Sequence, residues 1–457
     1  MGRMFGTNGV RGVVNEYMNA NLALGMGKAI GKVYGGTVAL ATDTRLSADM
    51  ISSAVASGLM AMGCDVLFLG VVPTPALQYF VKTHEEVNGG VMITASHNPP
   101  EFNGIKCISA DGTEASAMEE SAIEDAYSRE LEGVEWSRVG EVRDVTGAGE
   151  AYVDAIVSKV DAEAIREAKL TVVLDCANGA AFETTPLLLK KLGVRAVTLN
   201  CNPQGEFPGH NSEPTEDNLT DLKTLVTAMG ANLGIAHDGD ADRCVFVDDM
   251  GTYVPGDKTL ALISKSILDN NPGGIVVTPV ATSSLVKEVV ESNGGHLVTT
   301  AVGSPVVART MIKEDAVFGG EENGGLIFPD MQFCRDGGMA IARMLEAIIS
   351  NGPLSEQLSV LPVYHTVKTK LHCPDDMKSD LAKHFATSVS GGTVDMTDGV
   401  KLIFDDGWVL LRASGTEPLF RVYSESKDRA VAESRAQEYL DMADLFVNGP
   451  SDNVLEL

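Results

Sequence analysis

The chain has 457 residues, 44% of them hydrophobic and 21% charged, which is an ordinary globular composition and more chain than one hydrophobic core serves. Its 63 acidic and 35 basic side chains give a net charge of −28, which disfavours nucleic acid and anionic membranes as partners because the long-range field repels phosphate. There is no apolar run long enough to span a membrane and no CxxC pair among the seven cysteines, so we expect a cytoplasmic protein with reduced thiols, no disulfide framework and no zinc site.

The first segment with a recognisable pattern is MFGTNGVRG, residues 4–12. It combines three glycines with one cation, Arg11. Glycines are what turns are made of, so the pattern alone also fits an ordinary turn. We keep Arg11 as a candidate site residue.

A pattern of strand, helix and strand then occurs three times along the chain. An apolar run, an amphipathic stretch and a second apolar run follow one another in each copy, as in a βαβ unit. The three copies cover residues 37–43, 48–62 and 64–70; 170–176, 182–192 and 194–200; and 273–279, 283–292 and 296–300.

Each copy is followed by an apolar strand, a polar loop and another apolar strand. The loops are TASHNPPEFNG (94–104, the serine loop), HDGDADR (237–243, the aspartate loop) and GGEENGG (319–325, the glutamate loop). Loops at strand ends are where α/β sheets bind ligands. We therefore expect three similar mixed α/β domains around a central cleft, in which one loop supplies a nucleophile, one a metal and one substrate recognition.

The repeat stops after about Pro362. WVLLRASGTEPLFRVYSESK (408–427) lies between strand-like runs, and a helical stretch runs from about Asp428 to Leu445, which predicts a smaller α+β domain. The predicted domains are residues 1–147, 148–251, 252–361 and 362–457.

The serine loop places Ser96 at the mouth of a sheet. Val91, Met92 and Ile93 form a short apolar run, and loop-forming residues stop it directly before the serine. His97 offers a proton acceptor and Lys106 a cation, so Ser96 has what a covalent nucleophile needs. The alternative is a turn that happens to contain a serine.

Three acids alternate in the aspartate loop: Asp238, Asp240 and Asp242. This spacing lets three carboxylates turn toward one hard divalent cation. A calcium loop of the EF-hand type is excluded, because Arg243 stands where glycine is required and Asp249 where glutamate is required. The alternative is an exposed acidic turn.

The two remaining loops carry groups suited to a sugar and to a phosphate. Glu321 and Asn323 offer an acceptor and a donor on a turn rich in glycine. In the sequence RASGTEPLFR, hydroxyls, backbone N–H groups and guanidinium forks suit a phosphate dianion, although a surface turn with two incidental arginines is the alternative. The residues of this arginine loop are Arg412, Ser414, Gly415, Thr416 and Arg421.

Taken together, the four loops resemble those of the alpha-D-phosphohexomutases, the family of phosphoglucomutase, phosphomannomutase and phosphoglucosamine mutase. TASHNPPEFNGIK resembles the family's phosphoserine loop, and DGDADR matches its magnesium loop. The motifs occur in the family's order, so the resemblance covers nearly the whole chain. It implies the same architecture of three similar domains and a smaller last one.

The resemblance also implies residue roles. Ser96 would carry the transferred phosphoryl group, with Arg11 facing it and Arg243 adding a donor. One Mg²⁺ would be held by the three aspartates and a phosphoserine oxygen. Glu321 and Asn323 would hold sugar hydroxyls, and the arginine loop would grip the phosphate that is not reacting.

The expected activity is interconversion of hexose 6-phosphate and hexose 1-phosphate, with a hexose 1,6-bisphosphate as intermediate and activator. Many bacterial members have serine in place of Asn323 and histidine in place of Gly325, so the loop looks like that of archaeal members. Relatives place aspartate or histidine where Ser304 stands, which makes His97 and Lys106 the better candidates for proton transfer. Glucosamine phosphate is the first expected substrate, with mannose and glucose phosphates as alternatives.

Two other functions remain open from the sequence. One is a magnesium-dependent sugar-phosphate phosphatase, and the other is a non-catalytic protein that binds sugar phosphates. The sequence predicts no oligomeric state.

Overall fold

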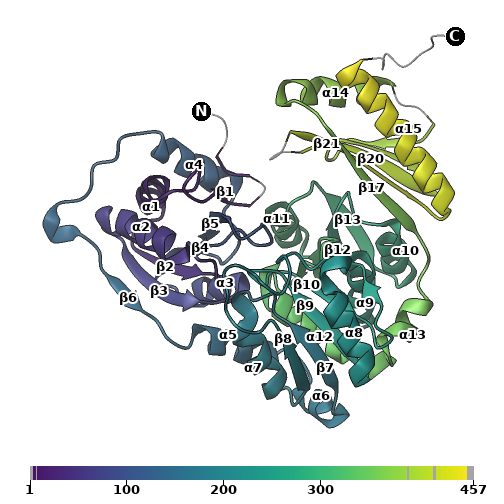
Figure 1. Ribbon diagram of the computed structural model, residues 1–457, viewed down its shortest axis with the longest axis horizontal. Coiled ribbons are helices and arrows are strands. Elements are labelled where there is room, and N and C mark those ends of the chain that lie inside the picture. The colour runs from purple at the N-terminus through teal and green to yellow at the C-terminus, as the bar shows by residue number, and fades with distance from the viewer. Residues whose placement is uncertain (1–3, 7, 389–390, 415–417, 450–457) are drawn as a thin grey trace.

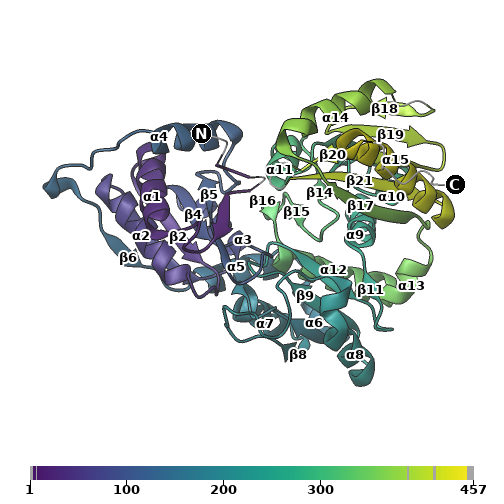
Figure 2. The same ribbon diagram turned by 45° about the horizontal axis from the view of Figure 1, so that its top comes forward.

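The computed structural model describes residues 4–6, 8–388, 391–414 and 418–449. These residues form four sheets, each flanked by helices, that follow one another in chain order from the purple N-terminal lobe to the yellow C-terminal lobe (Figures 1 and 2). The expected mixed α/β fold is confirmed.

The first three sheets share one core of four strands with one topology. Two strands pair in parallel, a third pairs in parallel with the first of them on its other side, and a fourth returns antiparallel to the third. The predicted threefold repeat is therefore present. In chain order its strands are β2 (Thr37–Thr42), β3 (Asp65–Val71), β4 (Val87–Ile93) and β5 (Phe102–Ser109); β7 (Thr171–Asp175), β8 (Arg195–Leu199), β9 (Leu233–His237) and β10 (Cys244–Val247); and β12 (Ile275–Pro279), β13 (His296–Thr300), β14 (Phe318–Gly320) and β15 (Leu326–Phe328).

Two helices belong to each copy. One links the first two strands: α2 (Ala48–Ala61), α7 (Thr184–Lys191) and α10 (Ser284–Ser292). The other, which the sequence analysis did not predict, precedes the third strand: α3 (Thr74–Thr83), α8 (Thr220–Met229) and α11 (Ser304–Glu314). The remaining elements of these domains are β1 (Val10–Val13), α1 (Ala20–Tyr34), α4 (Ala117–Tyr127), β6 (Val142–Asp144), α5 (Ala148–Val157), α6 (Ala162–Ala168), β11 (Tyr253–Val254), α9 (Gly256–Asn270), β16 (Gln332–Arg335), α12 (Gly337–Asn351) and α13 (Leu354–Ser359).

Strand β4 illustrates why the loops are held firmly. Its last three residues, Val91, Met92 and Ile93, are fully buried, as expected where helices cover both faces of a parallel sheet. Thr94 continues the fully buried run, and Ser96 stands two residues beyond it. The serine loop thus follows directly from a fully buried strand end.

The last sheet is antiparallel and has its own hydrophobic core. Two helices pack against it, α14 (Asp375–Ser388) and α15 (Arg429–Asn448), and α15 begins close to the predicted start at Asp428. Its elements are β17 (His365–His372), α14 (Asp375–Ser388), β18 (Thr393–Asp395), β19 (Val400–Phe404), β20 (Gly407–Ala413), β21 (Leu419–Ser426) and α15 (Arg429–Asn448).

The cores of the first three domains are not separate. One buried cluster contains side chains from all three repeats. The last domain has a core of its own and also shares a small buried cluster with the third domain, formed by Val280, Ala281, Trp408 and Leu410. Strand β11 pairs with β10, so the second sheet extends past the predicted domain boundary at residue 251. The four predicted domain ranges therefore stay a proposal. Among the described residues, no helix combines the length and the apolar character needed to cross a bilayer.

Candidate active site

Ser96 sits in a strained and buried turn. Its φ is +52°, in the left-handed region that residues other than glycine rarely adopt, which costs about 1 to 3 kcal/mol. The serine is 1% exposed, and its backbone N–H donates to Thr94 Oγ1 at 2.8 Å. An incidental surface serine would have neither property, so the turn is built to hold Ser96 in one orientation.

Arg45, a residue that the sequence analysis missed, holds the serine loop through hydrogen bonds to its backbone. Arg45 is 2% exposed, and its guanidinium donates to backbone carbonyls of the loop at 2.7 to 2.9 Å. The acceptors are the carbonyls of Ser96, Asn98, Pro99 and Phe102. Its position in DTRLS, the segment that follows buried strand β2, is the signal that could have identified it.

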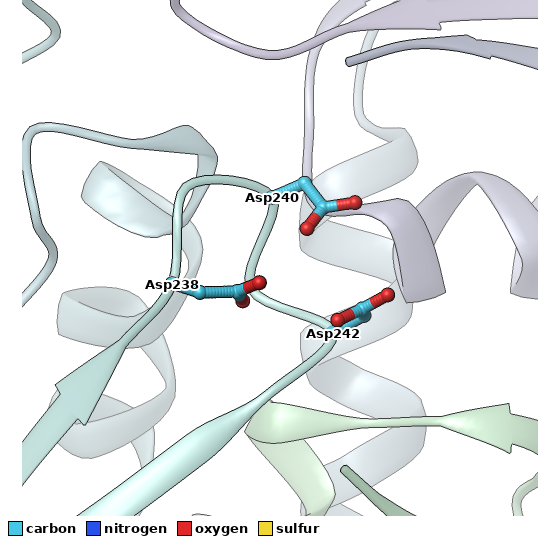
Figure 3. Close-up of side chains that lie close together, drawn as sticks. All are labelled: Asp238, Asp240 and Asp242. Carbon is cyan, nitrogen blue, oxygen red and sulfur yellow. The ribbon is translucent and has the colours of Figure 1, made fainter. Parts of the chain in front are cut away.

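The aspartate loop brings its three carboxylates together in the interior (Figure 3). Asp238 and Asp240 are fully buried, and Asp242 is 1% exposed. One carboxylate oxygen from each lies within 4.8 Å of the others. The alternative of an exposed acidic turn is therefore wrong. Because a side chain on Gly239 would approach the Ser96 carbonyl oxygen to 2.5 Å, this glycine lets the two loops touch.

The carboxylate oxygens divide into a partnered set and a free set. Asp240 Oδ2 accepts from Lys106 Nζ at 2.5 Å and from Thr74 Oγ1 at 2.6 Å, and Asp242 Oδ2 accepts from Lys106 Nζ at 3.2 Å. The Oδ1 atoms of Asp240 and Asp242 are buried and have no hydrogen-bond partner, although Arg243 Nε lies 4.0 Å from Asp242 Oδ1. Buried unpaired carboxylate oxygens are costly without a cation, so this donor set fits a hard divalent metal.

Ser96 joins the two loops chemically. Its Oγ donates to Asp238 Oδ2 at 2.7 Å, although 142 residues separate the two in sequence. Burial raises the pKa of Asp238 to about 7 against the opposing effect of Arg243, and neighbouring Asp240 and Asp242 raise it further. A phosphoryl group on Ser96 would add negative charge here, so the site needs additional positive charge before it can hold a phosphoserine.

Lys106 lies within β5 and is fully buried between two of the aspartates. Burial alone would lower its pKa, but the carboxylates of Asp240 and Asp242 raise it. The same ion pair holds the pKa of Asp240 far below its usual range, against the effect of burial. Lys106 is therefore a fixed ammonium group that can donate hydrogen bonds and attract phosphate.

His97 lies beside the serine, with Nδ1 at 3.3 Å from Ser96 Oγ. Burial, together with the charges of Arg243 and Arg11, lowers its pKa to about 2. The imidazole is neutral near pH 7, so it can share a hydrogen bond but is a weak base.

The two arginines predicted near the serine both lie there. Arg243 Nε donates to Asp238 Oδ2 at 3.1 Å, and its Nη2 is buried without a partner. Arg11, on edge strand β1, donates to Asn98 Oδ1 at 3.1 Å, and its Nε is likewise unpartnered. Unused guanidinium donors beside Ser96 are suited to phosphate oxygens.

The glutamate loop reaches the aspartate loop through a residue that the motifs did not indicate. Glu321 is 4% exposed, and its Oε2 accepts from Arg335 Nη1 at 3.0 Å. Arg335 Nη2 donates to Asp242 Oδ2 at 2.5 Å. Asn323 Oδ1 accepts from the Gly325 backbone N–H at 3.1 Å, which shapes the turn.

The strands on either side of the arginine loop, β20 and β21, belong to the last lobe (Figures 1 and 2). Arg412 and Arg421 are paired residues of the two strands, and Arg412 Nε donates to Asp398 Oδ2 at 2.7 Å. Ser414 is 3% exposed. The predicted residues Gly415 and Thr416 lie outside the described residues.

Ser304, which stands where the resemblance places an acid or a histidine, links the first and third domains. Its Oγ donates to Glu114 Oε2 at 2.6 Å. The residue is 3% exposed, and this contact occupies its hydroxyl.

Comparison with known proteins accounts for this arrangement. Four family models match the chain in order: phosphoglucomutase/phosphomannomutase alpha/beta/alpha domains I (2–133), II (150–251) and III (255–364), and the C-terminal domain (369–442). The chain belongs to the alpha-D-phosphohexomutases. It is therefore an enzyme of a mutase family, as the motifs implied.

Relatives of similar length carry names from this family. The "Phosphoglucomutase/phosphomannomutase" of Thermococcus kodakarensis is 43% identical, with 97% of this chain and 98% of the relative covered. A "Probable phosphoglucosamine mutase" of Methanopyrus kandleri is 43% identical with the same shares covered. The crystal structure of a phosphoglucomutase/phosphomannomutase family protein from Burkholderia thailandensis has a TM-score of 0.86 at 27% identity, covering 99% of this chain and 98% of that one.

Proposed function

We propose that this phosphohexomutase interconverts hexose 6-phosphate and hexose 1-phosphate through a phosphoserine at Ser96. The observation that carries the proposal is the hydroxyl of Ser96, held 2.7 Å from Asp238 among carboxylates with unpaired oxygens and arginines with unused donors. A neutral serine does not require that surplus of charged groups. A transferring phosphoryl group does, because its charge spreads over three oxygens.

In the proposed reaction, phospho-Ser96 gives its phosphoryl group to the free hydroxyl of the hexose phosphate. The serine oxygen–phosphorus bond breaks and a bond from phosphorus to the sugar oxygen forms. The sugar hydroxyl loses its proton, the serine oxygen gains one, and the product is a hexose 1,6-bisphosphate. The bisphosphate turns end for end, and Ser96 takes the other phosphoryl group. Hexose 1,6-bisphosphate added to the unphosphorylated enzyme would activate it by the second of these transfers, in which Ser96 takes a phosphoryl group from the bisphosphate.

One Mg²⁺ is the proposed cofactor. Asp238, Asp240 and Asp242 would hold it together with an oxygen on Ser96, and bound there it would supply positive charge to the transferring group. Arg243 and Arg11 would bind the equatorial phosphoryl oxygens through their unpartnered nitrogens.

Proton transfer is assigned to the two residues beside the serine, with different roles. The adjacent carboxylates keep Lys106 charged. Its ammonium would give a proton to the leaving serine oxygen, because a serine alkoxide is a stronger base than a lysine amine, and would be recharged by the proton that the sugar hydroxyl loses. Neutral His97 suits a hydrogen bond that orients the hydroxyl. A loose phosphoryl-transfer transition state asks little of a base, so the weakness of His97 as a base is compatible with this assignment.

Glucosamine phosphate is the proposed preferred substrate, with mannose and glucose phosphates as alternatives. The glutamate loop supports it by its archaeal-type sequence, and the relatives' names include both phosphoglucosamine mutase and phosphoglucomutase/phosphomannomutase. We expect the highest kcat/KM for glucosamine 1-phosphate when the three 1-phosphates are assayed in parallel with Mg²⁺. A higher value for mannose or glucose 1-phosphate would assign the enzyme to that sugar instead.

Cation binding is expected to depend on pH through Asp238. Its pKa is raised to about 7, so in the metal-free protein it holds a proton below that pH, and a cation must displace the proton. The Kd for Mn²⁺ should therefore rise by about tenfold per pH unit as pH falls below 7 and level off above it. Calorimetric titration from pH 5 to 8 measures this, with Asp238→Asn as the variant that loses the slope. A Kd that stays constant from pH 5 to 7 would contradict the assignment.

Arg421→Ala is expected to weaken the 1-phosphate and the 6-phosphate equally. If one phosphate site serves both orientations of the sugar, losing a charge-assisted contact should cost each about 1.5 to 3 kcal/mol. We would measure KM and kcat/KM in both directions and follow release of the 1,6-bisphosphate, which should increase. An effect on one substrate alone, without extra release, would mean that the two ends use different phosphate sites.

A phosphatase is the second candidate, since it would also use aspartates and a phosphoenzyme. The two are separated by mass spectrometry of the resting protein, because a phosphatase would have no stable phosphoserine. Release of inorganic phosphate at the rate of substrate loss would favour the phosphatase. A scaffold that only binds sugar phosphates would show neither activity.

A further inference from the structure

Arg335 is the last residue of β16, and its guanidinium is enclosed by groups from two loops. One arm donates to Asp242 and the other to Glu321. The exposed fractions of the three side chains are 10%, 2% and 6%. A planar fork with both arms used in this way holds two carboxylates in a defined geometry relative to each other.

The surrounding chain makes room for this fork. Gly325 lies outside the left-handed backbone region, so its backbone would accept a side chain. A Cβ on it, however, would lie 2.2 Å from Arg335 Cδ and 3.0 Å from Arg335 Cγ. A side chain at Gly325 would therefore displace Arg335, and Asn323 Oδ1 would lie 3.1 Å from the same Cβ.

The hydrogen bonds to Asp242 and Glu321 also distinguish Arg335 from the residues expected to contact the transferring phosphoryl group. Both terminal nitrogens of Arg335 are occupied by carboxylates, whereas its Nε, like that of Arg11, is buried without a hydrogen-bond partner. Its terminal nitrogens act on Glu321 and Asp242, so its effect on a sugar would pass through Glu321.

We propose that Arg335 is a positioning residue for sugar recognition, holding the Glu321 carboxylate in the orientation that accepts hydrogen bonds from the sugar while tying it to the aspartate loop. Gly325 is the residue that lets this fork form. The inference rests on the proposed function and deepens it, because it names the residue that prepares the sugar site.

The test measures binding without turnover. Glucosamine 1-phosphate, mannose 1-phosphate and glucose 1-phosphate are each titrated by calorimetry into the full chain carrying Ser96→Ala, and the tightest of them serves as the probe. Arg335→Ala and Arg335→Lys should each raise its Kd by about tenfold or more, the loss expected for one charge-assisted hydrogen bond. Gly325→Ala should raise it comparably with the arginine still present, so the result does not depend on folding of the Arg335 variants.

Two double-variant comparisons separate positioning from direct contact. In a Glu321→Gln background, Arg335→Ala should change Kd by less than about twofold, because the residue through which it acts is already altered. In an Arg335→Ala background, Gly325→Ala should also add little, since the overlap has gone. Full additivity of Arg335→Ala with Glu321→Gln would overturn the inference and make Arg335 a direct substrate contact.

The protein that carries only Ser96→Ala is the reference, and its binding of sugar phosphates separates failure of the proposed function from failure of this inference. If none of the three sugar phosphates binds to the chain with Arg335 intact, the proposed function fails and this inference with it. If the reference binds and neither Arg335→Ala nor Gly325→Ala changes Kd, the inference alone is overturned.

Discussion

Ser96→Ala is expected to lower mutase turnover by at least about a thousandfold, equivalent to about 4 kcal/mol of transition-state stabilisation. The hydroxyl is the atom that carries the phosphoryl group, so its removal closes the covalent route rather than weakening it. Sugar-phosphate binding should persist, because the glutamate and arginine loops are unchanged. Initial rates with saturating 1-phosphate and Mg²⁺ measure the first effect, and calorimetric titration measures the second.

The matched control is Ser57→Ala, which removes a hydroxyl from the exposed face of α2, far from the loops in sequence and bonded only within its helix. It should leave the rate unchanged. Mass spectrometry adds an independent reading, since phosphate should be found on the peptide containing Ser96 in the unaltered protein and be absent from the variant. Retention of the original rate by Ser96→Ala would show that the serine is not the phosphoryl carrier.

Asp240→Asn is expected to abolish most of the activity together with its dependence on Mg²⁺. The change removes one of three clustered carboxylates, whose Oδ1 has no other partner, and leaves Lys106 with one acidic neighbour fewer. We expect kcat to fall by about a hundredfold or more, because stabilisation by a bound cation is worth several kcal/mol. Asparagine keeps the size of the side chain, which avoids a cavity in this buried loop.

Mn²⁺ titration of the same variant should show weaker binding, independently of catalysis. Asp248→Asn is the matched control, because Asp248 is a buried aspartate of the same domain that accepts from the Met250 and Thr252 backbone N–H groups and does not belong to the cluster. It should keep the response to Mg²⁺. Full activity of the unaltered protein in excess chelator would show that the aspartate loop does not hold a metal ion that activity requires.

Much of the fold and of the candidate site is readable along the chain. Apolar runs such as Val91 to Ile93 mark buried strands, and a loop after each third strand follows from local turn chemistry. Ser96 and Asp240 could be singled out in this way because each lies in a short motif with its own composition. Arg45 and Arg335, which the sequence did not reveal, bind loops other than their own. Neither lies in a motif whose sequence indicates which loop it contacts.

By itself, the sequence determined that three α/β units repeat, that a distinct polar loop follows each and that the last domain differs, because strand and helix periodicity and turn chemistry are local properties. Only the tertiary structure decided which side chains meet. Lys106 and Asp240 are 134 residues apart, and Arg335 and Asp242 are 93 apart, yet both pairs are joined at 2.5 Å. Such pairs depend on how the three domains pack through a shared core. A buried charge must be neutralised by an opposite charge, and the packing of the domains decides which one lies near it.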